Sequence, residues 1–294
     1  MMMFQITAFG IVVIYLLQWF VREDDPGSFF LKFTAISAAG WMVEETAIRI
    51  YHFYQYSPDW DLFLGHVPIL VVLVWPLVIH SGWELASRLM SGNKRHVHLA
   101  AAVIIGIDAS LVETISVKAG LWSWNTGGIW GVPLIGIFGW VYFSLLSILI
   151  LRLKRVRKAG IAKLFFMFIL TVCSTHVLIV ATWWLIFRWI PFPINPALTA
   201  AMAWFVSILL MYSVHRSNLG GNLDSKILIL RVPPALLFFI LYLKGSPEAF
   251  YTAYAVAFAF SYLFLLCKIS TGRQDFRLSK DRGETAVNAP TPSN

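Results

Sequence analysis

Four carboxylic acids lie inside apolar stretches long enough to cross a membrane. Glu44 and Glu45 stand in WMVEETAIRIYHFYQY, and Asp108 and Glu113 stand in VHLAAAVIIGIDASLVETISVKAG. An aspartate at the centre of a membrane helix costs about 3 kcal/mol on insertion scales, so such acids face a bundle interior or a wet cavity and are functional candidates. The simpler alternative is a protonated acid that hydrogen-bonds a neighbouring helix. We expect a functional role for Glu45, Asp108 and Glu113, and either role for Glu44.

Tryptophans are dense just after the second pair of acids, in GLWSWNTGGIWGVPLIGIFGW (120–140). Aromatic belts at membrane interfaces are common, and this is the plain interpretation of Trp122, Trp124 and Trp130. Acids beside aromatic rings in an apolar pocket also suit a specific chemistry. Burial keeps a carboxyl protonated so that it can act as a general acid, and aromatic faces stabilise positive charge. Together they suit protonation of an alkene and shelter of the resulting carbocation.

The composition indicates an integral membrane protein. The chain has 294 residues, of which 59% are hydrophobic and 13% charged, and its mean hydropathy is +0.72; a soluble domain carries about 25% charged residues. The net charge of +8 comes from short loops, so it indicates topology rather than a nucleic-acid partner. The sequence contains no HExxH, His-box, DDxxD, GxGxxG or GxSxG motif, and its two cysteines stand in apolar stretches.

The hydropathy predicts an all-α, polytopic transmembrane helix bundle of about 8–9 spans in one domain (1–269), followed by a polar, disordered cytoplasmic tail (270–294). The expected spans are 3–21, 28–50, 62–82, 97–118, 129–151, 161–187, 195–214, 227–243 and 248–267. Seventeen of the 23 lysines and arginines lie at the loops after the odd-numbered spans and in the tail. This bias places the N-terminus outside and the C-terminus in the cytoplasm, in a cell membrane.

Two sequence blocks carry a resemblance to a known family. The first has an acid (Glu44 or Glu45), then YxY at 54–56, LG at 64–65, VP at 67–68 and Trp75. The second has Asp108 and Glu113, then GxWxW at 120–124, GVPL at 131–134 and GW at 139–140. In these blocks the chain resembles the membrane carotenoid-biosynthesis proteins that include the carotenoid terminal hydratases (bisanhydrobacterioruberin hydratase-like). It departs from the family pattern in having Glu-Thr at 113–114 for Asp-Pro and Gly136 for Asn.

The resemblance implies a lyase without cofactor or metal, which protonates a terminal double bond of an acyclic carotenoid and adds water to the tertiary cation. The implied acids are Glu113, Asp108, Glu45 and Glu44. The implied substrate-binding residues are Tyr54, Tyr56, Trp75, Trp122, Trp124, Trp130, Pro133 and Trp140, with Pro68 and Pro133 expected to bend their spans. Proton loss in place of hydration would make the same machinery a lycopene-type or meroterpenoid cyclase.

The sequence also leaves two non-enzymatic functions open. Intramembrane acids also serve proton relays, so a small transporter or lipid-binding membrane protein is one alternative. The sequence shows no inverted repeat with paired broken helices, which argues against it. A scaffold in a complex with other pigment-pathway enzymes is the second alternative, although a scaffold has no need of Asp108 at mid-membrane.

Overall fold

The structure is a computed structural model that describes residues 1–20, 25–90, 94–152, 161–216, 225–245, 248–261 and 263–264. The long helices are α1 (Met2–Phe20), α2 (Pro26–Arg49), α3 (Ile69–Leu89), α4 (Val97–Lys118), α5 (Leu134–Arg152), α6 (Ile161–Leu185), α7 (Pro196–Arg216) and α8 (Ser225–Lys244), with a shorter final helix, Ala249–Ser261. Short 3-10 turns are η1 (Lys94–His96) and η2 (Phe187–Trp189), and four short strands are β1 (Tyr54–Tyr56), β2 (Phe63–Leu64), β3 (Val67–Pro68) and β4 (Trp122–Trp124). The predicted helical class is confirmed over these residues.

Six of these helices are long and apolar enough to cross a membrane: Met2–Phe20, Ile69–Leu89, Val97–Lys118, Leu134–Arg152, Leu164–Trp189 and Pro196–Ser213. Their exposed surfaces carry large apolar side chains such as Phe165, Phe166 and Val177. Water would penalise such a surface and lipid would not. The helices therefore fit a multi-pass membrane protein. The tail predicted to be disordered (270–294) lies outside the described residues.

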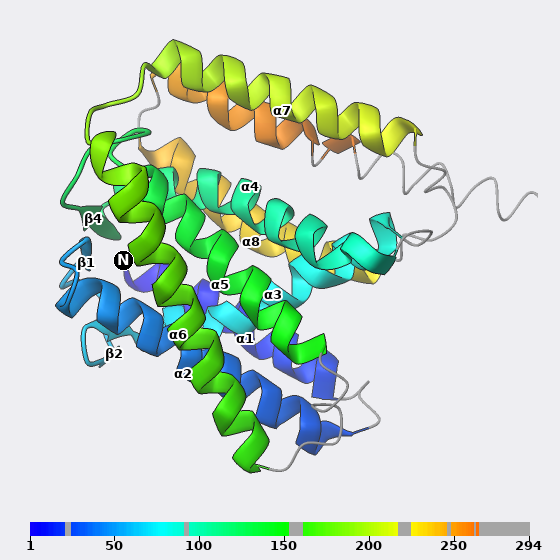
Figure 1. Ribbon diagram of the computed structural model, residues 1–294. Coiled ribbons are helices and arrows are strands. Elements are labelled where there is room, and N and C mark those ends of the chain that lie inside the picture. Colours follow the sequence, from blue (N-terminus) through cyan, green and yellow to red (C-terminus); the bar gives the residue numbers. More distant parts are fainter. Residues whose placement is uncertain are drawn as a thin grey trace, which may run out of the picture.

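Helices α3, α4 and α5 form the centre of the bundle. Helix α4 packs against both α3 and α5, α1 and α8 also contact α3, and α2 packs against α6. Helix α7 and the final helix run side by side along one edge (Figure 1), where Ser207 donates a hydrogen bond to the carbonyl of Ala257 at 2.6 Å. The strands β1 and β4 pair over one end of the bundle, where α2 and α4 end. This end holds the candidate site.

Two expected spans begin later than their hydropathy indicates. The span expected at 62–82 is wrong at its start, because residues 63–68 form the β2–β3 hairpin around Gly65, whose φ of 64° requires glycine or strain. The span expected at 129–151 begins at Leu134, after a tight turn in which Ile129 pairs with Val132. Both segments are apolar enough for a membrane helix, but their positive-φ residues select a turn instead.

The expected bends at Pro68 and Pro133 are also wrong. Pro68 is the N-cap residue of α3, and Pro133 stands one residue before α5, so neither proline interrupts a helix. A proline at a helix start replaces an amide that would have no helical partner anyway. The proline inside α3 is Pro76, one residue after Trp75.

Candidate active site

A cavity of ≈ 390 Å³ lies inside the bundle, where α1, α2, α3, α4, α5 and α8 line it, and it reaches β1 and β4 at one end. Most of its wall is apolar, with Phe143, Phe238 and Phe258 among the largest side chains. Four charged or acidic side chains interrupt this wall: Glu44, Asp108, Glu113 and Arg231. Helices and strands far apart in sequence therefore bring the predicted acids Glu44, Asp108 and Glu113 into one cavity.

Glu113 lies at the end of the cavity near β4 and is only 4% exposed. Its carboxyl group accepts three indole N–H hydrogen bonds. Trp122 and Trp124 donate to Oε2 at 2.9 Å and 3.1 Å, and Trp140 donates to Oε1 at 2.8 Å. An indole nitrogen can only donate, so the three tryptophans hold the carboxyl in one orientation without neutralising it.

Glu44 is the counterpart of Glu113 on α2 and is 8% exposed. Its Oε2 accepts hydrogen bonds from the phenols of Tyr54 and, at 2.9 Å, Tyr56. Its Oε1 accepts from the indole of Trp75 at 3.2 Å. Each of the two carboxyls is thus held by three aromatic donors.

The donors to one carboxyl pack on the donors to the other. Ring centroids lie 4.6 Å apart for Tyr54 and Trp124, 5.7 Å for Tyr56 and Trp122, and 4.7 Å for Trp75 and Trp140. We call these six residues the aromatic cage. Aromatic pairs at such separations contribute about 0.5–1.5 kcal/mol beyond burial, so the cage couples the positions of the two acids.

Strand geometry explains two of the three aromatic pairs. In the antiparallel β1–β4 ladder, Tyr54 lies opposite Trp124 and Tyr56 lies opposite Trp122. Alternate residues of a strand face the same side, so YxY and WxW place all four rings toward the cavity while Gln55 and Ser123 point outward and are exposed. The third pair comes from α3 and α5, which approach from the helical side.

The phenol of Tyr56 keeps its proton in this setting. Burial raises the pKa of Tyr56 well above its ordinary value, and the neighbouring Glu44 carboxyl raises it further. A protonated phenol can donate a hydrogen bond to Glu44, and it carries no charge of its own. Tyr56 therefore serves as a hydrogen-bond donor to Glu44.

Asp108 lies elsewhere in the cavity, where it forms an ion pair with Arg231 of α8. Their side chains are 20% and 7% exposed. Asp108 and Glu113 are five residues apart on α4, or about 140° around the helix. Both side chains line the same cavity, because the cavity extends around this side of α4. They lie at different points of its wall. The guanidinium is permanently charged, so Asp108 serves as its counter-ion.

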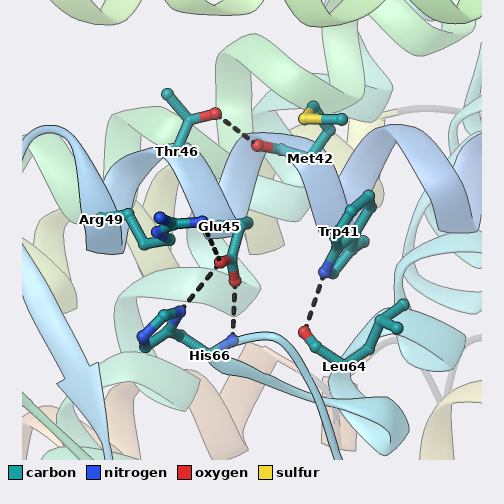
Figure 2. A network of polar contacts seen from close by, with 7 residues as sticks. All are labelled: Trp41, Met42, Glu45, Thr46, Arg49, Leu64 and His66. Atoms are coloured by element: carbon teal, nitrogen blue, oxygen red, sulfur yellow. Dashed lines mark hydrogen bonds and ion pairs between the residues drawn. The ribbon is translucent and has the colours of Figure 1, made fainter.

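Glu45 does not line the cavity. It points to the other side of α2, toward the β2–β3 hairpin (Figure 2), and accepts hydrogen bonds from the backbone N–H of His66 at 2.7 Å and from its imidazole Nδ1 at 2.9 Å. Arg49 lies 3.8 Å from the same carboxyl. One turn earlier, Trp41 donates to the carbonyl of Leu64 at 2.9 Å. Glu45 thus holds the hairpin against α2, and its neighbour Glu44 is the residue that lines the cavity.

Of the remaining predicted site residues, Trp130 and Pro133 are absent from the cavity wall. Trp130 packs on Tyr251 and Tyr254 of the final helix, with ring centroids 5.1 Å and 4.8 Å away. Sequence reasoning missed Arg231. A lone arginine flanked by apolar residues inside an expected span is the signal that could have identified it.

The role of Glu45 leads to a prediction on the hairpin. Replacing Glu45 by alanine should speed hydrogen exchange of the His66 amide about tenfold or more, because a hydrogen bond to a charged group contributes about 1.5–3 kcal/mol. Exchange measured by mass spectrometry on the detergent-solubilised protein tests this. Arg49→Ala is the control, since Arg49 is exposed and its 3.8 Å pair is expected to contribute under 1 kcal/mol. Equal protection in wild type and Glu45→Ala would contradict the assignment.

Two glycines of α5 offer a matched test of the cage. A Cβ added at Gly136 would stand 2.6 Å from Cζ2 of Trp124, whereas one added at Gly139 meets nothing within 4 Å. Gly136→Ala should therefore push Trp124 off Glu113 and lower the free energy of unfolding by about 1–3 kcal/mol. Gly139→Ala should raise it by about 0.5–1 kcal/mol through helix propensity. Unfolding followed by tryptophan fluorescence measures both, and equal effects would refute the tight contact.

Among the described residues, no group of three or more His, Cys, Asp or Glu side chains could hold a metal ion. No protein-family model, curated protein or solved structure matches the chain. The geometry of the cavity is therefore the basis for assigning a function.

Proposed function

We propose that the protein is a membrane-embedded isoprenoid hydratase that works without a cofactor, with Glu113 and Glu44 as its acid and base. The single observation that carries the proposal is the pair of buried carboxyls in one apolar cavity, each oriented by three aromatic donors. The two blocks that resemble carotenoid terminal hydratases supply all six residues of the aromatic cage. A carotenoid or a related isoprenoid is therefore the proposed substrate.

In the proposed reaction, one carboxyl donates its proton to the less substituted carbon of a trisubstituted double bond. This forms a C–H bond and a tertiary carbocation and leaves a carboxylate. Water then attacks the cation, the C–O bond forms, and the other carboxylate takes the released proton. The sum is addition of H₂O to C=C, and transfer of a proton between the two acids restores the starting state. The cage rings stabilise the cation through their electron-rich faces.

Size and polarity of the cavity suit an isoprenoid end. A volume of ≈ 390 Å³ falls in the range that holds a drug-sized ligand, so the cavity takes a short isoprenoid or one end of a longer carotenoid. Asp108 is paired with Arg231, so it is a poorer choice than Glu113 or Glu44 for the proton donor.

The proposal includes the nine-span topology with the N-terminus outside, in the cell membrane. In this topology the aromatic cage lies in the outer half of the membrane.

A cyclase is the second candidate, and the scarcity of polar groups favours it. Apart from the cage, the acids and Arg231, the described wall offers few polar side chains, among them Ser81 and Tyr15. An ordered water needs about 2–4 polar partners. If no water reaches the cation, attack by a second double bond followed by proton loss to the carboxylate would give a ring instead of an alcohol.

Product mass tests both candidates. The wild-type protein is expressed in a host that makes an acyclic carotenoid such as lycopene, and the pigments are extracted for mass spectrometry. A gain of one water per modified end supports the hydratase. A product of unchanged mass with altered absorption supports the cyclase. Unchanged pigment in that host, and in hosts that make hydroxylated carotenoids or shorter isoprenoids, would overturn the proposal.

A further inference from the structure

We infer that Asp108 and Arg231 form a second subsite of the cavity that binds a hydroxyl group of the substrate. The ligand class is then an oxygenated isoprenoid rather than a pure hydrocarbon. This inference rests on the proposed function for the identity of the reacting double bond, and it assigns the recognition of the substrate to residues outside the aromatic cage.

The two polar zones of the cavity are separate along α4. Asp108 and Glu113 are five positions apart on α4, which corresponds to about 7.5 Å along the helix axis. Leu111 and Val112 line the cavity between them, and Val74 and Val78 line it on α3. A bound chain would therefore meet acids at the cage, then an apolar stretch, and then the ion pair.

A contribution to stability alone does not explain why this ion pair is present. Replacing a buried pair by well-packed apolar residues is often neutral or stabilising, so α4 and α8 could be joined by leucine or methionine. The pair also belongs to the cavity wall, and Asp108 keeps 20% of its side chain exposed while Arg231 keeps 7%. Both residues of the pair thus line a space that a ligand can occupy.

The chemistry of the pair matches a hydroxyl. A carboxylate only accepts hydrogen bonds and a guanidinium only donates them. A hydroxyl does both, so it can donate to Asp108 and accept from Arg231 at once. A carbonyl or ether oxygen can only accept, and it would use Arg231 alone. A hydrocarbon would use neither group, and sites built to bind a hydroxyl discriminate strongly against analogues that lack it.

Ligand binding tests the subsite without any turnover. The cavity wall includes Trp75, Trp122, Trp124 and Trp140. A change in tryptophan fluorescence therefore reports occupancy of the cavity in detergent. The probes are the C20 alcohol geranylgeraniol, its methyl ether and the hydrocarbon that lacks the oxygen. We expect wild type to bind the alcohol at least tenfold more tightly than the hydrocarbon. In Asp108→Leu/Arg231→Met this ratio should fall to that of micelle partitioning alone. An unchanged ratio in the double variant would overturn the inference.

The methyl ether provides a measurement that needs no variant. It keeps the contact with Arg231 and loses the donor to Asp108, so wild type should bind it between the alcohol and the hydrocarbon. Equal binding of alcohol and ether would overturn the two-sided contact. Glu113→Gln separates this inference from the proposed function, because it should lose turnover and keep the preference for the alcohol. A preference that depends on the ion pair, in a protein that converts no isoprenoid, would leave the subsite standing and remove the hydratase.

Discussion

Replacing Glu113 by glutamine is expected to lower product formation by about 10³-fold in a host that supplies the substrate. Glutamine keeps the shape of the side chain and can still accept from Trp140 and its neighbours, but it carries no acidic proton. General acid catalysis by a positioned group contributes about 10²–10⁴-fold. Glu44→Gln should show a loss of similar size, because the proposed cycle uses both carboxyls. Product is quantified by mass spectrometry against the amount of protein in the membrane.

The neighbouring acid is the matched control for this experiment. Glu45 follows Glu44 directly, lies on the same turn of α2 and contacts His66 outside the cavity. Glu45→Gln keeps an oxygen acceptor for His66 and should retain product formation within a few-fold. The assignment would be reversed if Glu45→Gln lost activity while Glu44→Gln kept it. Retention of activity in both Glu113→Gln and Glu44→Gln would show that these acids only hold the helices together.

Replacing Arg231 alone by methionine is expected to lower the free energy of unfolding by about 3 kcal/mol. Breaking one side of a buried ion pair costs about 3–5 kcal/mol because the other charge stays buried without compensation. We expect the lower end of that range, since Asp108 is one-fifth exposed. Unfolding by titration with a denaturing detergent, followed by tryptophan fluorescence, measures the difference from wild type.

The double variant shows whether this loss comes from the stranded charge. Asp108→Leu/Arg231→Met should recover most of the stability, because no charge then remains between α4 and α8. If the double variant is as unstable as the single one, the ion pair itself joins the two helices. In that case the discrimination between alcohol and hydrocarbon becomes the sole criterion for the subsite.

Local chemistry explains which parts of the site were predictable. The YxY and WxW patterns each place alternate rings on one side, and both sets do line the cavity. A helix turns about 100° per residue, so the consecutive residues Glu44 and Glu45 must face different sides of α2. Periodicity could not show which side faces the cavity, because both neighbours of α2, the bundle and the β2–β3 hairpin, present polar partners. The choice of Glu44 follows from packing against Trp75 and Tyr54.

The sequence by itself determined the apolar helical character of the chain, the intramembrane acids and the aromatic residues beside them, since these follow from composition and from short motifs. Only the tertiary structure decided that Tyr54 and Tyr56 meet Trp124 and Trp122 across a strand pair, and that Arg231 meets Asp108 across 123 positions of chain. The physical reason is that local patterns specify the direction of a side chain relative to its own element. The partner it meets depends on how distant elements pack, and several packings would satisfy the same apolar faces.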